Sequence, residues 1–289
     1  MKIFGIPRNP YATNVSDALV AAAKRHDVPM RIIDLPTLGV DFRADGAATV
    51  SDQDGTVAIG GLAPYLLFGY PAAAHAVQSL ARECYLQNPL DAVLVADDKA
   101  ATAGHLAADG VAQVATMVCA MEDGQAIATA EKIGYPVVLK RTHGAQGKWV
   151  RRAADAAGVR KALGELELEG PGALIVQPEI VEAEGRSIRV VLTAGQLLAA
   201  AERIAGPDEW RSNIAVGAKQ RPIKLTLAEE TLAKHAIETL GLKHAGVDLL
   251  RTARGPVVLE VNACPDFTSM QPYFDHDLAH AVLMASMPN

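Results

Sequence analysis

Residues 245–262 read AGVDLLRTARGPVVLEVN, and this stretch decides the fold. It contains two apolar runs separated by the turn Arg254-Gly255, which is the pattern of a β-hairpin. Residues i and i+2 of a strand point to the same side, so Glu260 and Asn262 share a face, and the hairpin brings Asp248 opposite them. Two carboxylates and an amide supply the hard oxygen ligands that Mg²⁺ prefers. A solvated hairpin face is the alternative, but unpaired carboxylates between otherwise apolar strands are costly.

Upstream of this hairpin, an apolar strand ends in Lys140 and leads into a loop with two glycines at 144–147. Glycines let backbone N–H groups approach phosphates closely, and the lysine supplies a fixed positive charge. The lysine precedes the glycines, so the loop is not a Walker A motif. An ordinary β-hairpin turn, with Val150-Arg151 as the partner strand, remains the alternative.

A third group combines cations and an amide: Arg189, Arg203, Arg211 and Asn213. Arg189 interrupts an apolar strand, and Arg211 begins an Arg-Ser-Asn sequence in a polar loop. Arginine matches carboxylates and phosphates with a planar, two-pronged donor. Each residue alone fits a surface position. Together with the acidic hairpin they indicate an anion-binding cleft beside a metal.

The rest of the chain alternates strands and helices, which predicts an α/β fold of three consecutive units. Residues 1–96 form an open α/β unit, with helices at 14–26 and 72–86 and short strands at 57–59 and 65–68. Residues 92–95 form another short strand or the lead-in to the next unit. Residues 97–177 form a small α+β unit. Residues 178–289 form an antiparallel sheet with flanking helices. The loop 7–11 follows the first strand, where open α/β sheets place ligand loops, so it contacts a substrate or is only a Pro-rich turn.

Composition excludes several classes of protein. The 289 residues carry a formal net charge of -6, which disfavours a nucleic-acid-binding protein. No run of eighteen apolar residues occurs, so we expect no membrane span. The 3 cysteines lie far apart, without the spacing of a metal site or a disulfide framework. This usage is typical of the reducing cytoplasm, where we expect the protein to work.

These motifs occur in an order that resembles the ATP-grasp carboxylate–amine ligases, and within them the RimK-type glutamate ligases. The matching stretches run from about residue 98 to 265, and the first ninety residues match only in overall pattern. They are Gly144-Ala145-Gln146-Gly147, Val176-Gln177, Glu182-Ala183-Glu184-Gly185, Ile188-Arg189, Arg211-Ser212-Asn213, Ala245-Gly246-Val247-Asp248 and Leu259-Glu260-Val261-Asn262. The resemblance implies an ATP-grasp fold in which 1–96 is a pre-ATP-grasp domain, and 97–177 and 178–289 are the central and C-terminal subdomains.

The resemblance also implies a role for each site residue. Lys99 and Lys140 neutralise the α- and β-phosphates of ATP, while the loop 144–147 closes over the β- and γ-phosphates. Adenine binds the hinge through the Pro178 carbonyl and the Glu179 N–H. The remaining nucleotide contacts are Gln177, Ile180, Ser187, Arg211, Ser212 and Asn213. Arg189, Arg211 and Asn213 act in catalysis, and Asp248, Glu260 and Asn262 hold two Mg²⁺ ions, with Mn²⁺ as an alternative.

Three positions depart from the family pattern. Pro178 replaces an acidic residue, although its carbonyl remains available to adenine. Ser187 stands where an aspartate usually holds the ribose hydroxyls, so the ribose contact is weaker or Glu182 or Glu184 replaces it. Cys264 stands in place of a small residue, and nothing indicates a catalytic thiol.

The activity that the resemblance implies is an ATP-dependent ligation. An acceptor carboxylate becomes an acyl phosphate, and the amine of an amino acid, with glutamate favoured, attacks it. The acceptor is a peptide tail or a small coenzyme. Two alternatives stay open: a lysine-biosynthesis-type ligase that acts on an amino-group carrier protein, and a nucleotide-binding module with impaired catalysis. The family also implies a homo-oligomer.

Overall fold

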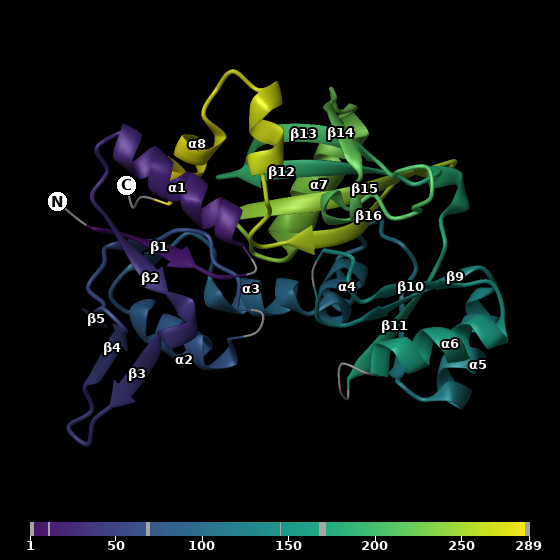
Figure 1. The fold of residues 1–289 in the computed structure, drawn as a ribbon, viewed down its shortest axis with the longest axis horizontal. Helices are drawn as coiled ribbons and strands as arrows, with labels where there is room; N and C mark the ends of the chain where they lie inside the picture. The colour runs from purple at the N-terminus through teal and green to yellow at the C-terminus, as the bar shows by residue number, and fades with distance from the viewer. Residues whose placement is uncertain (1–2, 11, 68–69, 145, 168–171, 287–289) are drawn as a thin grey trace.

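The computed structural model describes residues 3–10, 12–67, 70–144, 146–167 and 172–286. Within these ranges the strands form one parallel sheet and three antiparallel sheets (Figure 1). The expected α/β fold with an open N-terminal sheet and antiparallel sheets after it is confirmed.

The N-terminal unit is built on a parallel sheet in the order β2-β1-β6-β7. Helix α1 packs on this sheet through Val15, Leu19 and Ala22, which recur at helical spacing and are buried. A small antiparallel sheet of β3, β4 and β5 projects from its edge (Figure 1). The elements are β1 (Phe4–Arg8), α1 (Thr13–Arg25), β2 (Met30–Asp34), β3 (Gly39–Phe42), β4 (Ala48–Asp52), β5 (Gly55–Thr56), β6 (Gly61–Leu62), α2 (Pro71–Leu80), β7 (Tyr85–Leu86) and α3 (Leu90–Asp97).

The two short strands expected at 57–59 and 65–68 are wrong, and of the two alternatives for residues 92–95 the strand is wrong. Residues 92–95 lie inside α3, which begins directly after Pro89. A run of four apolar residues shows no periodicity, so the sequence cannot distinguish a strand from a buried helix. Here the segment is a helix with Ala92, Val93 and Ala96 buried. Residues 57–59 and 65–67 lie outside any strand, and residue 68 is outside the described part of the chain. The strand in this region is β6, whose glycine lies tightly against the Phe4 ring.

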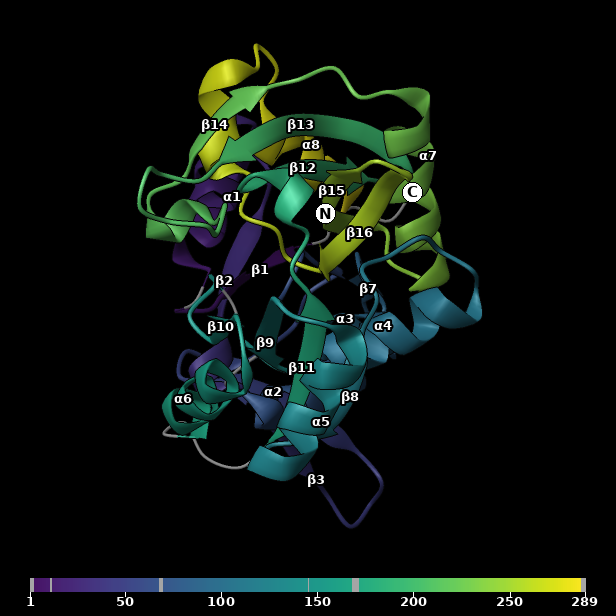
Figure 2. The ribbon, with the colours of Figure 1, turned by 90° about the vertical axis from the view of Figure 1, so that its right-hand side faces the viewer.

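The central unit is an antiparallel sheet in the order β10-β9-β11-β8, covered by α5 and α6 (Figure 2). The expected hairpin across the glycine loop is present, since Val150 of β10 pairs with Lys140 of β9. Helix α4 precedes the sheet, and its first turn is capped by the Asp98 carboxylate. The elements are α4 (Lys99–Ala108), β8 (Met117–Ala120), α5 (Asp123–Ile133), β9 (Val137–Arg141), β10 (Val150–Ala153), α6 (Ala156–Glu167) and β11 (Ala173–Pro178).

The C-terminal unit is an antiparallel sheet in the order β14-β13-β12-β15-β16. Its last two strands form the hairpin expected from residues 245–262, with Asp248 paired to Glu260 and Gly246 to Asn262. The elements are β12 (Arg186–Thr193), β13 (Gln196–Ile204), β14 (Lys219–Pro222), α7 (Leu227–Thr239), β15 (His244–Thr252), β16 (Gly255–Asn262) and α8 (Leu278–Ala285), with 3-10 turns at Leu35–Thr37, Val181–Ala183, Ile214–Val216 and Thr268–Tyr273.

Hydrophobic packing divides the molecule differently from the chain order. The buried side chains of the N-terminal unit and of the C-terminal sheet form shared clusters, in which Phe4 and Leu19 pack with Val282. The central unit has a separate cluster around Leu139, Leu163 and Val176. Figure 2 shows this unit below the C-terminal sheet, with β11 leading up into it. The glycine loop between β9 and β10 is therefore carried by the unit that has its own hydrophobic core.

Candidate active site

Two cavities meet where β15 and β16 face the glycine loop. The first has a volume of about 450 Å³ and lies between the central and C-terminal sheets. The second, of about 340 Å³, lies between the C-terminal sheet and the N-terminal unit. Lys99, Arg203, Asp248 and Glu260 line both cavities. A group bound at these side chains would therefore contact the contents of both spaces.

The side chains that line both cavities form a common wall between them. The hairpin contributes Asp248 and Glu260 to this wall, and Asn262 lies beside them. Asp248 and Glu260 line both cavities, whereas Asn262 lines only the second. The Asp248 carboxylate accepts hydrogen bonds from Arg189 Nε at 2.6 Å and Nη2 at 2.7 Å. Burial opposes ionisation of Asp248, but the charge and hydrogen bonds of Arg189 outweigh it and hold the pKa of Asp248 below its usual range. Asp248 is therefore an anion at neutral pH.

The two lysines expected at the phosphates reach the same wall. Lys99 Nζ lies 3.2 Å from Glu260 Oε1 and donates to the Gly144 carbonyl at 2.6 Å. Lys140 is buried at the end of β9, which lowers its pKa to about 8 although Glu260 raises it. An anionic ligand at this place would accept charge-assisted hydrogen bonds from both ammonium groups. For Lys99 these bonds would replace its present contacts with Glu260 and the Gly144 carbonyl.

The glycine loop touches the Arg-Ser-Asn segment across the first cavity. Arg211 Nη1 donates to the Gly147 carbonyl at 2.7 Å. Gly147 has a positive φ of 71°, and a Cβ there would lie 2.8 Å from Asn213 Oδ1. Residue 147 is therefore glycine for two reasons: the positive φ disfavours other residues, and any Cβ would clash with the Asn213 side chain. Ala145, expected in the loop, lies outside the described residues.

The hinge offers adenine a different N–H from the one expected. The Glu179 N–H donates to the Pro136 carbonyl at 3.0 Å, because β11 continues its ladder with β9. Neighbouring residues of an antiparallel ladder face opposite sides, so the Pro178 carbonyl points away from β9. The Ile180 N–H has no hydrogen-bond partner among the described residues. The Pro178 carbonyl and the Ile180 N–H therefore form the acceptor and donor pair that an adenine edge needs.

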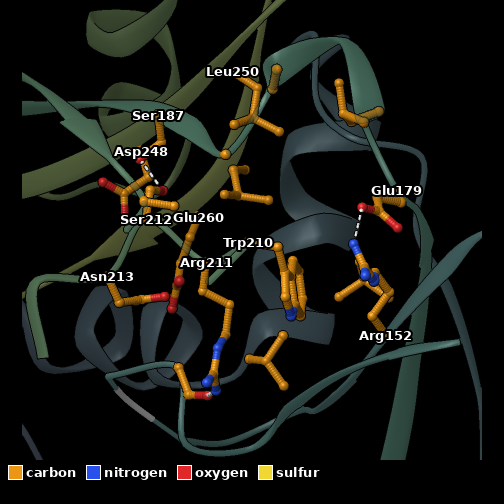
Figure 3. Close-up of a pocket in the computed structure, with 18 of the residues that line it drawn as sticks. Arg152, Glu179, Ser187, Trp210, Arg211, Ser212, Asn213, Asp248, Leu250 and Glu260 are labelled. Atoms are coloured by element: carbon orange, nitrogen blue, oxygen red, sulfur yellow. Dashed lines mark hydrogen bonds and ion pairs between the residues drawn. The ribbon is translucent and has the colours of Figure 1, made fainter. Parts of the chain in front are cut away.

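Ser187 and the Arg-Ser-Asn segment line the first cavity on the side opposite Glu179 (Figure 3). Ser187 Oγ lies 2.6 Å from Ser212 Oγ, so the two hydroxyls hold each other. Arg211 Nη2 pairs with Glu209 Oε2 at 2.7 Å, and hydrogen bonds from Arg211 lower the pKa of Glu209 to about 2. Of the other expected residues, Gln177 lines this cavity and binds Thr116, while Gln146 and Asn213 line both cavities.

Arg189, expected to act in catalysis, lies beside Asp248. It lines the second cavity, while the first is reached by its partner Asp248. Of the loop at 7–11, Pro10 lines the second cavity, and Asn9 is buried and donates to the Leu66 carbonyl at 2.8 Å. Tyr11 lies outside the described residues. A contact between this loop and a substrate stays a prediction.

Arg203, which the sequence placed in an anion-binding cleft, lines both cavities. Three other lining residues received no role from the sequence. Trp149 and Trp210 line the first cavity, and Asp266 lines the second. These three follow or precede matched motifs, and only the tertiary structure brings them to the cavities. Cys264 also lines the second cavity, where burial raises its pKa to about 12 and keeps the thiol protonated.

The residues on the common wall fit a divalent metal ion. Asp248 and Glu260 supply carboxylate oxygens and Asn262 an amide oxygen, which is the donor set that Mg²⁺ takes. Asn262 Nδ2 is buried and has no hydrogen-bond partner in the part of the chain that the structure describes, so this amide is incompletely satisfied there. The neighbouring lysines and arginines would hold the phosphates that accompany such an ion.

Comparison with known proteins decides the family. The family model described as the RimK-like ATP-grasp domain matches residues 96–286. The chain belongs to the RimK-like ATP-grasp family. A probable alpha-L-glutamate ligase of Xanthomonas axonopodis pv. citri is 34% identical over 203 residues, which are 69% of this chain and 68% of that relative.

Two further similarities bear on extent and on fold. A probable alpha-L-glutamate ligase of Shewanella pealeana is 36% identical over 153 residues, which are 52% of this chain but only 32% of that relative. The crystal structure of a RimK domain ATP-grasp protein from Sphaerobacter thermophilus superposes with a TM-score of 0.73 at 19% identity, and covers 100% of both chains. The RimK-like ATP-grasp chain thus shares its whole fold with a solved structure.

Among the described residues, no helix of this RimK-like ATP-grasp chain is long and apolar enough to cross a membrane. Cys84, Cys119 and Cys264 are unpaired.

Proposed function

We propose that this RimK-like ATP-grasp protein is an ATP-dependent ligase that forms an amide bond between an acceptor carboxylate and the amine of an amino acid, with glutamate favoured. The observation that carries the proposal is the common wall. The acidic hairpin and two buried arginines separate a cavity with an adenine-binding edge from a second, mixed-charge cavity. A wall of this kind suits transfer of a phosphoryl group from one space to the other.

The nucleotide would occupy the first cavity. Adenine would bind the Pro178 carbonyl and the Ile180 N–H, and the phosphates would extend toward Lys99 and Lys140. Glu179 and Ser187 line the stretch between them, where the ribose belongs. The second half of the reaction would take place in the second cavity.

A carboxylate is a poor electrophile, and phosphorylation activates it. The acceptor oxygen attacks the γ-phosphorus, and the bond to the β-phosphate oxygen breaks, which gives ADP and an acyl phosphate. The amine then attacks the acyl carbon, phosphate leaves with its bonding electrons, and the amine proton passes to solvent. Arg189 would balance the negative charge that accumulates at the carbonyl oxygen and the phosphoryl group. No side chain forms a covalent bond.

Asp248, Glu260 and Asn262 would hold Mg²⁺, which supplies charge neutralisation between two anions that must meet. Two ions, or Mn²⁺ in their place, fit the same donor set. Arg189 keeps the Asp248 carboxylate ionised and oriented. Lys99 Nζ lies 3.2 Å from Glu260 Oε1 and holds that carboxylate in place.

Exclusion of water protects the acyl phosphate from hydrolysis. The loop 144–147 is positioned for this task, because Lys99 and Arg211 already bind its Gly144 and Gly147 carbonyls. The separate core of the central unit lets this loop move with its sheet. The acyl phosphate would then form only while the loop 144–147 is closed and water is excluded.

Mass spectrometry tests the proposal. Candidate acceptors with free carboxylates are incubated with ATP, Mg²⁺ and single amino acids, and we expect one acceptor to gain the mass of a glutamyl residue with release of ADP. ADP release that needs no amine and yields no amide would overturn the proposal.

We also infer that the protein works in the cytoplasm as a homo-oligomer. The unpaired cysteines support the first inference, and the family resemblance supports the second. Light scattering of the purified chain tests the oligomer, and a monomer mass would contradict it.

A further inference from the structure

The second cavity is lined by charges of both signs on segments far apart in the sequence. Pro10 and Asn14 come from the N-terminal unit, Arg189 and Arg203 from β12 and β13, and Asp266 from the segment after β16. Its volume of about 340 Å³ is at the lower end of the roughly 300–1,000 Å³ typical of small-molecule pockets. The cavity therefore suits a small ligand that carries both charges.

Arg203 supplies the positive end. Only 6% of its surface is exposed, and its Nε has no hydrogen-bond partner among the described residues. Its Nη1 lies 3.7 Å from Asp248 Oδ1, whereas Arg189 binds the same carboxylate at 2.6 Å. A buried guanidinium with an unused donor is incomplete without an anion, and a carboxylate fits its planar fork.

Asp266 supplies the negative end at the exposed side of the same cavity. Its Oδ1 accepts hydrogen bonds from the Thr268 N–H at 2.9 Å and from Thr268 Oγ1 at 2.6 Å. These bonds fix the side chain, and Oδ2 has no hydrogen-bond partner among the described residues.

We propose that the second cavity binds the amino-acid substrate as a zwitterion, with its carboxylate at Arg203 and its ammonium group at Asp266 Oδ2. The inference rests on the ligase function proposed above and names the residues that select its amine substrate. Asp266 repels a ligand that carries only carboxylates, and Arg203 is left unpaired by a simple amine. The pair therefore selects α-amino acids over either class.

Calorimetry with two ligands tests the proposal. Glutamate and glutarate differ in the amino group, and each is titrated into the protein with Mg²⁺ and a non-hydrolysable ATP analogue. In the Asp266→Asn variant we expect glutamate to bind about tenfold more weakly than to the original protein, the scale of one charge-assisted hydrogen bond. Glutarate binding stays equal or becomes tighter, because the repulsion is removed.

Two further variants keep the test sharp. Asp275→Asn removes an exposed aspartate of the same C-terminal segment that lies outside the cavity lining, and should change neither affinity. Arg203→Lys keeps the charge but loses the planar fork, and should weaken glutamate and glutarate alike. Equal losses for both ligands in Asp266→Asn, no loss for either, or no glutamate binding by the original protein would overturn the inference.

The failure of this inference is distinguishable from the failure of the proposed ligase. If the original protein forms the amide and Asp266→Asn shows an unchanged KM for glutamate, the ligase stands and the zwitterion site falls. If the original protein forms no amide with any acceptor, the ligase itself falls.

Discussion

The two cavities share a wall but differ in how the sequence encodes them. The first is lined by contiguous motifs: the strand before the glycine loop, the hinge and the Arg-Ser-Asn segment. The second is lined by short stretches that lie far apart in the sequence, such as 12–15, 213–215 and 262–266, and by single residues such as Leu66. The nucleotide presents the same phosphates and base to every such enzyme, so short motifs suffice for it. A particular substrate is recognised by side chains that only tertiary packing brings together.

Glu260 lines both cavities, so the loss of its charge should impair both. We therefore expect Glu260→Gln to cause the largest decrease in turnover. Turnover should fall by about 10³-fold or more, because charge stabilisation of the transferring phosphoryl group is lost. ADP release measures it, and thermal unfolding should change little since Glu260 is partly exposed. The matched control is Glu238→Gln, an exposed position on α7. Near-normal turnover of the Glu260→Gln variant would show that the reaction does not need the Glu260 carboxylate.

A change confined to the first cavity separates it from the second. In Gly147→Ala the new Cβ would meet Asn213 Oδ1, and kcat/KM for ATP should fall about 10- to 100-fold, on the scale of 1–3 kcal/mol of backbone strain. Glutamate binding should change much less. Gly195→Ala is the control, because Gly195 also has a positive φ of 75° but open space around it. Equal effects of the two variants on ATP would refute the steric argument.

The charge of Lys140 predicts a pH dependence of the first cavity. Its pKa of about 8 lies below the ordinary value of 10.5, so the free protein loses this charge as the pH rises through 8. Bound phosphates favour the protonated form, so the Kd for ATP should increase by up to about tenfold per pH unit above 8. Calorimetry from pH 7 to 9.5 checks this, and Lys140→Met should flatten the profile. A rise in the original protein that persists in Lys140→Met would assign it to another group.

The smallest expected effect concerns the ribose. Ser187→Ala removes the hydroxyl that binds Ser212, and KM for ATP should rise about three- to tenfold, the scale of one hydrogen bond. Ser79→Ala, which removes a hydrogen bond to the His75 carbonyl in α2, is the control. An unchanged KM in Ser187→Ala would leave Glu179 or Glu184 as the ribose contact.

The same contrast explains what the sequence could predict. The hairpin at 245–262 combined apolar alternation with three polar exceptions, so both the strand pairing and the facing of Asp248 and Glu260 followed from a period of two. Residues 92–95 had no period, and packing made them a helix. The N–H of Glu179 was assigned to adenine because the register of β11 against β9 was unknown. Asp266 needed the tertiary structure, since no local pattern relates it to Arg203 about sixty positions earlier.

The central claim is that Asp248, Glu260 and Asn262 hold a divalent ion between the two cavities. Substituting Fe²⁺ for Mg²⁺ in the complex with ATP, followed by ascorbate and peroxide, cleaves the backbone beside the bound ion, and mass spectrometry locates the cuts. We predict cuts at 248 and at 260–262 that disappear in Glu260→Gln. Cuts confined to other segments, or cuts that persist in that variant, would contradict the account.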